Sequence, residues 1–131
     1  MRIKAFVHEA SIRLTPGVDP ATIGSAVTTE LCGSAEHEGD CRWPHNNAIE
    51  PHGDTAVFRT LFVAPEAEER EVRTRIRSAL RSSEYWFVIS DRARPLQSDE
   101  LPVAKRLDPN ARERSARVPG HQNPEMCHHT S

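Results

Sequence analysis

The stretch NAIEPHGDTAVFRTLFVA, residues 47–64, has the pattern of two strands joined by a turn. Residues 55–64 are rich in Val, Phe, Leu and Thr, which are enriched in strands, and His52-Gly53-Asp54 is typical of a turn. Residues 47–51 are more polar, so the pattern indicates only a short strand there. The fold of the whole chain depends on whether this short strand forms, because it sets the number of strands in the sheet.

The segments on either side alternate between strand and helix patterns. Residues 2–14 and 84–90 are rich in β-branched and aromatic residues, which predicts the first and last strands. Residues 19–32 and 65–82 carry apolar residues at helical spacing, which predicts two helices. The resulting βαββαβ order is typical of a ferredoxin-like fold, a two-layer α/β (α+β) sandwich with an antiparallel sheet and both helices on one face. Without the short strand, a two-layer sandwich of three strands and two helices remains.

Two local features refine this reading. Asp19 is the expected N-cap of the first helix, and Cys32 is its expected last residue. In the first strand, the apolar residues change parity between Val7 and Ile12, so we expect a bulge near residues 9–11.

The strand at residues 55–64 is apolar on both of its faces. Phe58 and Phe62 share one face, while Val57, Leu61 and Val63 occupy the other. A strand of this kind needs a cover on its second face. That cover is most simply a second copy of the protein or the C-terminal segment, so we expect a homodimer or a protein partner.

Composition limits the class of protein. The chain has 131 residues, enough for one domain with a core. Its hydrophobic and aromatic contents, 37% and 5%, are low, which predicts a small core and at least one poorly packed segment. A net charge of −2 favours neither nucleic acid nor an acidic partner.

The chain divides by character into three parts. We assign residues 1–95 to a single α/β domain that contains a Cys/His loop at residues 32–54. Residues 96–107 have the pattern of a short helical extension. Residues 108–131 have almost no large apolar side chains, which predicts a flexible tail.

The N-terminal sequence predicts a cytoplasmic protein. MRIKAFVHEASIRL, residues 1–14, lacks the apolar run of a secretory signal, and no window has the apolar length of a membrane helix. Cytoplasmic thiols stay reduced, and an odd number of cysteines, three, fits a disulfide framework poorly.

The loop sequence CGSAEHEGDCRWPHNN, residues 32–47, contains four potential metal ligands. They are Cys32, His37, Cys41 and His45, spaced C-x4-H-x3-C-x3-H. Thiolate and imidazole together favour zinc, and two Cys with two His is a common structural ligand set. The spacing therefore predicts a zinc site in this loop.

Other interpretations of the same loop stay open. The spacing lacks the C-x2-C knuckle of familiar zinc modules, and a polar loop can contain His without binding metal. Cys32 then acts as a small buried side chain and Trp43 as a plug that closes the core. A Cys32–Cys41 redox pair is a further alternative. The C-terminal cluster of Cys127, His128 and His129 can either donate a ligand or be part of an unstructured tail.

The number of protein ligands separates the functions that this loop can have. Four ligands close the site, and the metal is then structural. Three ligands leave a position for water, with Glu36, Glu38 or Glu50 as a base. No nucleophile elbow, phosphate-binding glycine loop or H-E-x-x-H motif is present. We therefore expect a non-enzymatic domain with a structural zinc loop. The alternatives are a small dimeric metal-dependent or redox enzyme and a metal-free interaction module.

Overall fold

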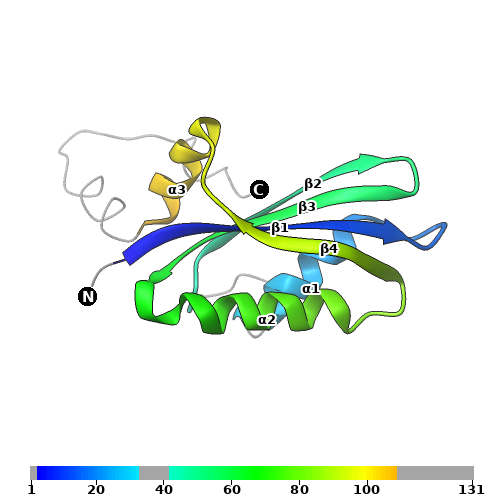
Figure 1. Ribbon diagram of the computed structural model, residues 1–131, viewed down its shortest axis with the longest axis horizontal. Coiled ribbons are helices and arrows are strands. Elements are labelled where there is room, and N and C mark those ends of the chain that lie inside the picture. The colour runs from blue at the N-terminus through cyan, green and yellow to red at the C-terminus, as the bar shows by residue number, and fades with distance from the viewer. Residues whose placement is uncertain (1–2, 33–41, 109–131) are drawn as a thin grey trace, which may run out of the picture.

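The computed structural model describes residues 3–32 and 42–108, which form an α+β fold with a four-stranded antiparallel sheet and three helices (Figure 1). The elements, in chain order, are β1 (Ile3–Leu14), α1 (Ala21–Cys32), β2 (His45–His52), β3 (Thr55–Pro65), η1 (Glu66–Glu68), α2 (Glu69–Arg81), β4 (Trp86–Arg94), η2 (Ser98–Glu100) and α3 (Leu101–Leu107). The strand order is β2-β3-β1-β4, and every neighbouring pair is antiparallel.

The short strand predicted at residues 47–51 forms, and it extends further at both ends as β2. It pairs with β3 from His45 opposite Phe62 to His52 opposite Thr55. Gly53 makes the connecting turn with a φ of 68°, a conformation that glycine adopts without strain. The hairpin places the start of β2 at an edge of the sheet, beside the C-terminal part of β3.

Helix α1 begins as the sequence predicts. The Asp19 carboxylate accepts a hydrogen bond from the Ala21 backbone N–H at 3.0 Å, and the Thr22 hydroxyl donates to the Asp19 carbonyl at 2.7 Å. The helix ends at Cys32, its expected last residue.

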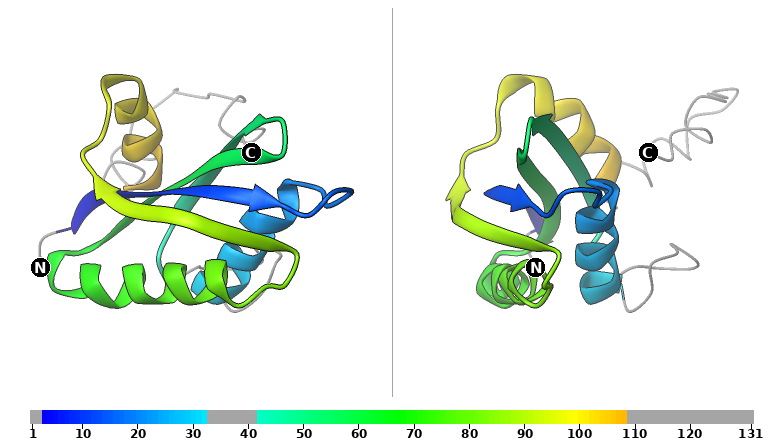
Figure 2. Two further views of the ribbon diagram at one scale, coloured as in Figure 1. Left: turned by 45° about the vertical axis from the view of Figure 1, so that its right-hand side comes forward. Right: turned by 90° about the vertical axis from the view of Figure 1, so that its right-hand side faces the viewer.

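Helices α1 and α2 lie on one face of the sheet, and α3 lies on the other (Figure 2). The main core fills the space between the sheet and the two long helices. Its largest fully buried side chains are Trp43, Phe58, Phe62, Ile12, Ile23, Ile76 and Leu80. The opposite face has a much smaller apolar cluster, in which Val7 and Leu61 pack against Ala104 of α3.

The second apolar face of β3 is therefore covered in part by the C-terminal segment. Residues 96–107, predicted as a helical extension, contain α3 and supply Leu96, Val103 and Leu107 to the small cluster. The predicted second copy stays a prediction. Nearly all of the predicted tail, residues 109–131, lies outside the residues that the structure describes.

The sequence predicts a bulge in β1, but a bulge in this strand does not explain why its apolar residues change parity. β1 pairs with β3 without interruption. A register shift occurs against β4 instead: Ser11 pairs with Ser90 but Ile12 pairs with Val88, so Ile89 of β4 is the additional residue. Apolar side chains are buried on both faces of β1, because helices cover both faces of the sheet.

Within residues 3–32 and 42–108, none of the helices combines the length and the apolar character that a membrane span requires.

Candidate metal centre

The end of α1 and the start of β2 bring two of the four predicted zinc ligands together. Cys32 is the last residue of α1 and His45 the first of β2, and Cys32 Sγ lies 3.9 Å from His45 Nδ1. On a tetrahedral zinc, sulfur at about 2.3 Å and nitrogen at about 2.0 Å lie about 3.5 Å from one another. The observed separation is close to this value, so the two atoms can share one metal ion after a small movement.

The imidazole of His45 is held in place at both nitrogens. Its Nδ1 lies 3.0 Å from the Trp43 carbonyl oxygen, and its Nε2 lies 2.9 Å from the Thr28 hydroxyl. Asn47 donates to the same hydroxyl at 3.1 Å and thereby fixes its position. Only 7% of His45 is exposed, so these contacts replace water at a buried polar ring.

The contacts of His45 define which tautomer a metal would require. With the hydrogen on Nδ1, the ring donates to the Trp43 carbonyl and accepts from Thr28. With the hydrogen on Nε2, the ring donates to the Thr28 hydroxyl, and Nδ1 no longer donates to the Trp43 carbonyl. A hydrogen bond from the second ring nitrogen is how metal-binding histidines are usually oriented. Cys32 and His45 are side chains of the kind that zinc binds, and zinc at Nδ1 would replace the contact with the Trp43 carbonyl.

Trp43 closes the core beside this pair, as its interpretation as a plug predicts. It is 2% exposed, and its indole N–H donates to the Glu68 carboxylate at 2.8 Å. The guanidinium groups of Arg42 and Arg75 lie 4.3 and 5.2 Å from the ring centroid. Cation–π contacts of this kind stabilise a ring that enters the core from a loop.

The other predicted ligands, His37 and Cys41, lie outside the described residues. Within residues 3–32 and 42–108, no group of three or more His, Cys, Asp or Glu side chains is arranged to hold a metal. The part of the chain that the structure describes thus contains two of the four predicted ligands, Cys32 and His45, and the zinc site stays a prediction. The C-terminal residues Cys127, His128 and His129 also lie beyond it.

Cys32 is disulfide-bonded in the structure. The other two cysteines of the chain, Cys41 and Cys127, are outside the described residues. A disulfide sulfur is not a thiolate, so zinc binding by Cys32 would require that this disulfide be reduced.

Glu50 is wrongly placed to serve as a base for a metal at His45. Successive side chains of a strand point to opposite faces, so Glu50 and His45, five residues apart in β2, lie on opposite faces of the sheet. The carboxylate of Glu50 instead lies 3.7 Å from His52 Nε2. The other two suggested bases, Glu36 and Glu38, fall in the segment that the structure does not describe.

A second buried histidine, His8, belongs to an ionic cluster that the sequence patterns do not reveal. His8 Nε2 lies 2.7 Å from Asp91 Oδ2, and Arg73 lies 3.0 Å from His8 Nδ1. Arginine can only donate, so Nδ1 accepts and the Nε2–H donates to Asp91. Burial lowers the pKa of His8, and attraction to Asp91 offsets only part of this effect, so the ring is neutral at pH 7.

Asp91 connects this cluster to the surface of α2. It accepts hydrogen bonds from Arg77 at 2.9 Å and from Arg81 at 2.7 Å. Burial acts to raise the pKa of Asp91, but the hydrogen bonds from His8, Arg77 and Arg81 outweigh it and lower the pKa to about 2. The cluster therefore joins α2 to β4 through one carboxylate.

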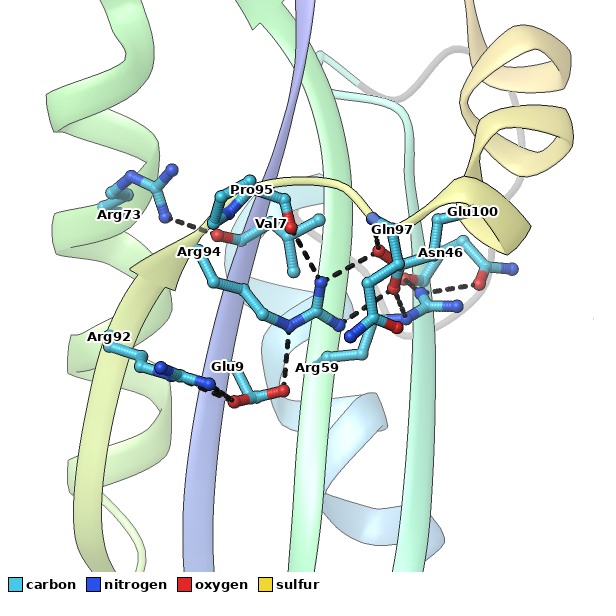
Figure 3. Close-up of polar contacts among 10 residues, drawn as sticks. All are labelled: Val7, Glu9, Asn46, Arg59, Arg73, Arg92, Arg94, Pro95, Gln97 and Glu100. Atoms are coloured by element: carbon cyan, nitrogen blue, oxygen red, sulfur yellow. Dashed lines mark hydrogen bonds and ion pairs between the residues drawn. The ribbon is translucent and has the colours of Figure 1, made fainter.

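A third polar cluster lies on the opposite face of the sheet, under α3 (Figure 3). Arg94 holds the Glu100 carboxylate through two bonds of 2.9 Å, and it also donates to Glu9 at 2.8 Å. Arg59 reaches the same Glu100 carboxylate at 3.1 Å and donates to the Asn46 side chain at 2.9 Å. Hydrogen bonds from Arg94 lower the pKa of Glu100 to about 2, against the opposing effect of burial.

The clusters around Asp91 and Glu100 have one signal in the sequence. It is a polar residue at a strand position where the alternation predicts an apolar one. Thr60 and His8 pair with one another on the face covered by α1 and α2. On the face covered by α3, Arg59 interrupts the apolar row of Val57 and Leu61. A lone polar residue does not identify its partner, because the partners are distant in sequence.

No family model and no curated protein matches the chain. Among solved structures, the chain is similar to the de novo designed protein Foldit4, with 11% sequence identity and a TM-score of 0.46. The match covers 72% of this chain and 100% of the designed protein. A likeness this distant carries no argument about fold or function.

Proposed function

We propose that the protein is a non-enzymatic domain whose loop binds a structural zinc through Cys32, His37, Cys41 and His45, and that it acts through a protein partner or by self-association. The observation that carries the metal is the 3.9 Å separation of Cys32 Sγ and His45 Nδ1. Two consecutive elements meet at this pair, and a zinc ion there would fasten the end of α1 to the start of β2.

We also propose that the fold is ferredoxin-like. Support comes from the βαββαβ order of its first six long elements and from the strand order β2-β3-β1-β4. In this arrangement the Cys/His loop is the connection between the first helix and the second strand.

A structural role suits this metal better than a catalytic one. His45 is almost completely buried, and its surroundings are the apolar core and the plug formed by Trp43. Glu50, one of the suggested bases, lies on the other face of the sheet. Zinc binding requires reduced Cys32, the state that the cytoplasmic location predicted from the sequence would favour.

The disulfide at Cys32 favours one alternative, a dithiol–disulfide function of the same loop. In that case the loop cysteines exchange between reduced and oxidised states without metal. Alkylation of the free thiols followed by mass spectrometry of the intact protein distinguishes the two. Zinc binding predicts reduced Cys32 and Cys41 in freshly purified protein, whereas the redox function predicts a mixture that shifts with the redox buffer.

The deciding experiment is the metal content of tag-free protein purified under reducing conditions without added metal. We expect about one zinc per chain that survives gel filtration and a lower melting temperature after chelation. Cys41→Ser should lose the zinc, and Cys127→Ser serves as the matched control that retains it. The proposal would be contradicted if the purified protein contained no zinc and its melting temperature were the same with and without chelator. His45→Gln is less informative for stability, because it also removes the contacts to Thr28 and Trp43.

A further inference from the structure

The surface beneath α3 contains a carboxylate-binding site that the chain fills with its own Glu100. Arg59 of β3 and Arg94 of β4 hold the two oxygens of this carboxylate between them (Figure 3). The side chains of Arg94 and Glu100 are 8% and 7% exposed. A buried pair of guanidinium groups that meets one carboxylate in this way has the geometry of an anion-recognition site.

An apolar surface adjoins the two arginines. Val7 and Leu61 are fully buried there, and Ala104, Val103 and Leu107 of the C-terminal segment pack on them. Residues 96–107 therefore bind the sheet as a peptide ligand would, with one acidic anchor followed by a short apolar helix.

The segment has little internal stability of its own. Helix α3 has seven residues, fewer than an isolated helix needs to persist in water. Its apolar contacts form a small cluster, whereas the core under α1 and α2 holds most of the buried side chains. Elements with few buried contacts open locally at a lower free energy than the whole domain unfolds.

Opening would leave a positively charged surface. Arg59, Arg92 and Arg94 would then face one carboxylate, Glu9, on this part of the sheet. Guanidinium groups held close together repel one another, so the exposed site favours an anion that pairs with them.

We propose that residues 96–107 are a displaceable cap, and that the surface beneath it is a docking site for a partner peptide of the same chemistry. That chemistry is a carboxylate followed within two helical turns by apolar side chains. The cap and the partner compete for Arg59, Arg94 and the apolar cluster, so the cap is autoinhibitory. The proposal is independent of the zinc loop, and a negative result for either leaves the other standing.

A peptide with the sequence of residues 95–108, labelled at its N-terminus, tests the proposal against the full chain. Glu100→Gln combined with Val103→Ser in the protein weakens the cap and leaves the sheet surface intact. We expect the peptide to bind this variant at least tenfold more tightly than it binds the wild type, because the wild-type cap competes. No binding to the folded variant would overturn the proposal.

Charge specificity supplies the control. The same peptide carrying Glu100→Gln should bind at least tenfold more weakly, and so should the intact peptide when Arg94→Gln is added to the protein. Arg92→Gln is the matched control, since Arg92 contacts Glu9 and not Glu100. Affinity that is indifferent to both Glu100 and Arg94 would contradict carboxylate recognition.

Hydrogen exchange of the wild-type chain covers the case in which the variant does not fold. The Glu100 backbone N–H donates to the Gln97 carbonyl at 2.9 Å within the cap. Its amide should exchange at least a hundredfold faster, relative to its intrinsic rate, than the amide of Phe62 in the core. Equal protection would show that the cap opens only with global unfolding, and the proposal would fail.

Discussion

The two faces of the sheet are stabilised by different means. Under α1 and α2, a large apolar core is supplemented by the ionic cluster of His8 and Asp91. Under α3, a few apolar contacts are supplemented by an extended arginine–glutamate network. Apolar burial is insensitive to pH, whereas ion pairs depend on the protonation of their carboxylates. The face under α1 and α2 therefore provides most of the stability. The face under α3 holds the C-terminal segment through ion pairs that a change of pH can weaken.

The largest difference should appear when each face loses one fully buried apolar side chain. Phe58→Ala on the face covered by α1 and α2 should cost about 3–5 kcal/mol of unfolding free energy, because it leaves a cavity in the main core. Leu61→Ala on the other face should cost about 2 kcal/mol, at the low end for such a change. Urea unfolding followed by tryptophan fluorescence measures both. Equal costs would contradict the division into a major and a minor core.

Asp91→Asn should have the next largest effect. The substitution removes the charge that holds His8, Arg77 and Arg81, and we expect a loss of about 2 kcal/mol. Glu84→Gln on the surface is the control and should change stability by less than about 0.5 kcal/mol. The same urea titration reports both variants. A loss as small as that of the control would mean that the ionic cluster contributes little to the main face.

Acid should act on the cap through Glu100. Its folded-state pKa, about 2, is below its ordinary value of 4.5, so the stability it contributes is present above pH 4.5 and is lost as the pH falls towards 2. Nuclear magnetic resonance signals of Ala104 and Leu61 should therefore broaden or shift in this range. Glu100→Gln should cost about 1.5–3 kcal/mol of cap docking at pH 7, because it removes a charged hydrogen-bond acceptor, and it should also remove this acid dependence. A wild-type cap that is unchanged at pH 2 would contradict the assigned role of Glu100.

The smallest effect is expected for Arg92→Ala. The Arg92 side chain is 69% exposed, and Arg94 continues to hold the Glu9 carboxylate when Arg92 is removed. We expect a change in unfolding free energy of at most about 0.5 kcal/mol. A loss above about 1 kcal/mol would place Arg92 within the network that fastens the cap.

The sequence predicts the secondary structure well, because the patterns that define it are local. Each pattern involves neighbours in the chain: the alternation over residues 55–64, the helix N-cap Asp19 and the helical spacing after Pro65. The short strand β2 is recognisable although it is polar, because a turn at residues 52–54 separates it from the clear strand at residues 55–64.

The polar clusters are harder to predict because each joins residues distant in sequence. His8 and Asp91 are separated by 83 positions, and only the pairing of β1 with β4 brings them together. The pair of Cys32 and His45 is easier, since both flank one loop. Its chemistry still depends on His37 and Cys41, which lie outside the described residues.

The additional residue in β4 has a consequence for how this chain can change in length. Val88 points into the main core and Asp91 points towards α2, while Ser90 lies on the opposite face. Removing Ile89 would restore regular alternation and keep each of these side chains on its present side. Removing Phe87 would instead reverse the residues on one side of the gap and turn core side chains towards solvent. Ile89 is therefore a position at which evolution can add or delete a residue without re-sorting the two faces of the strand.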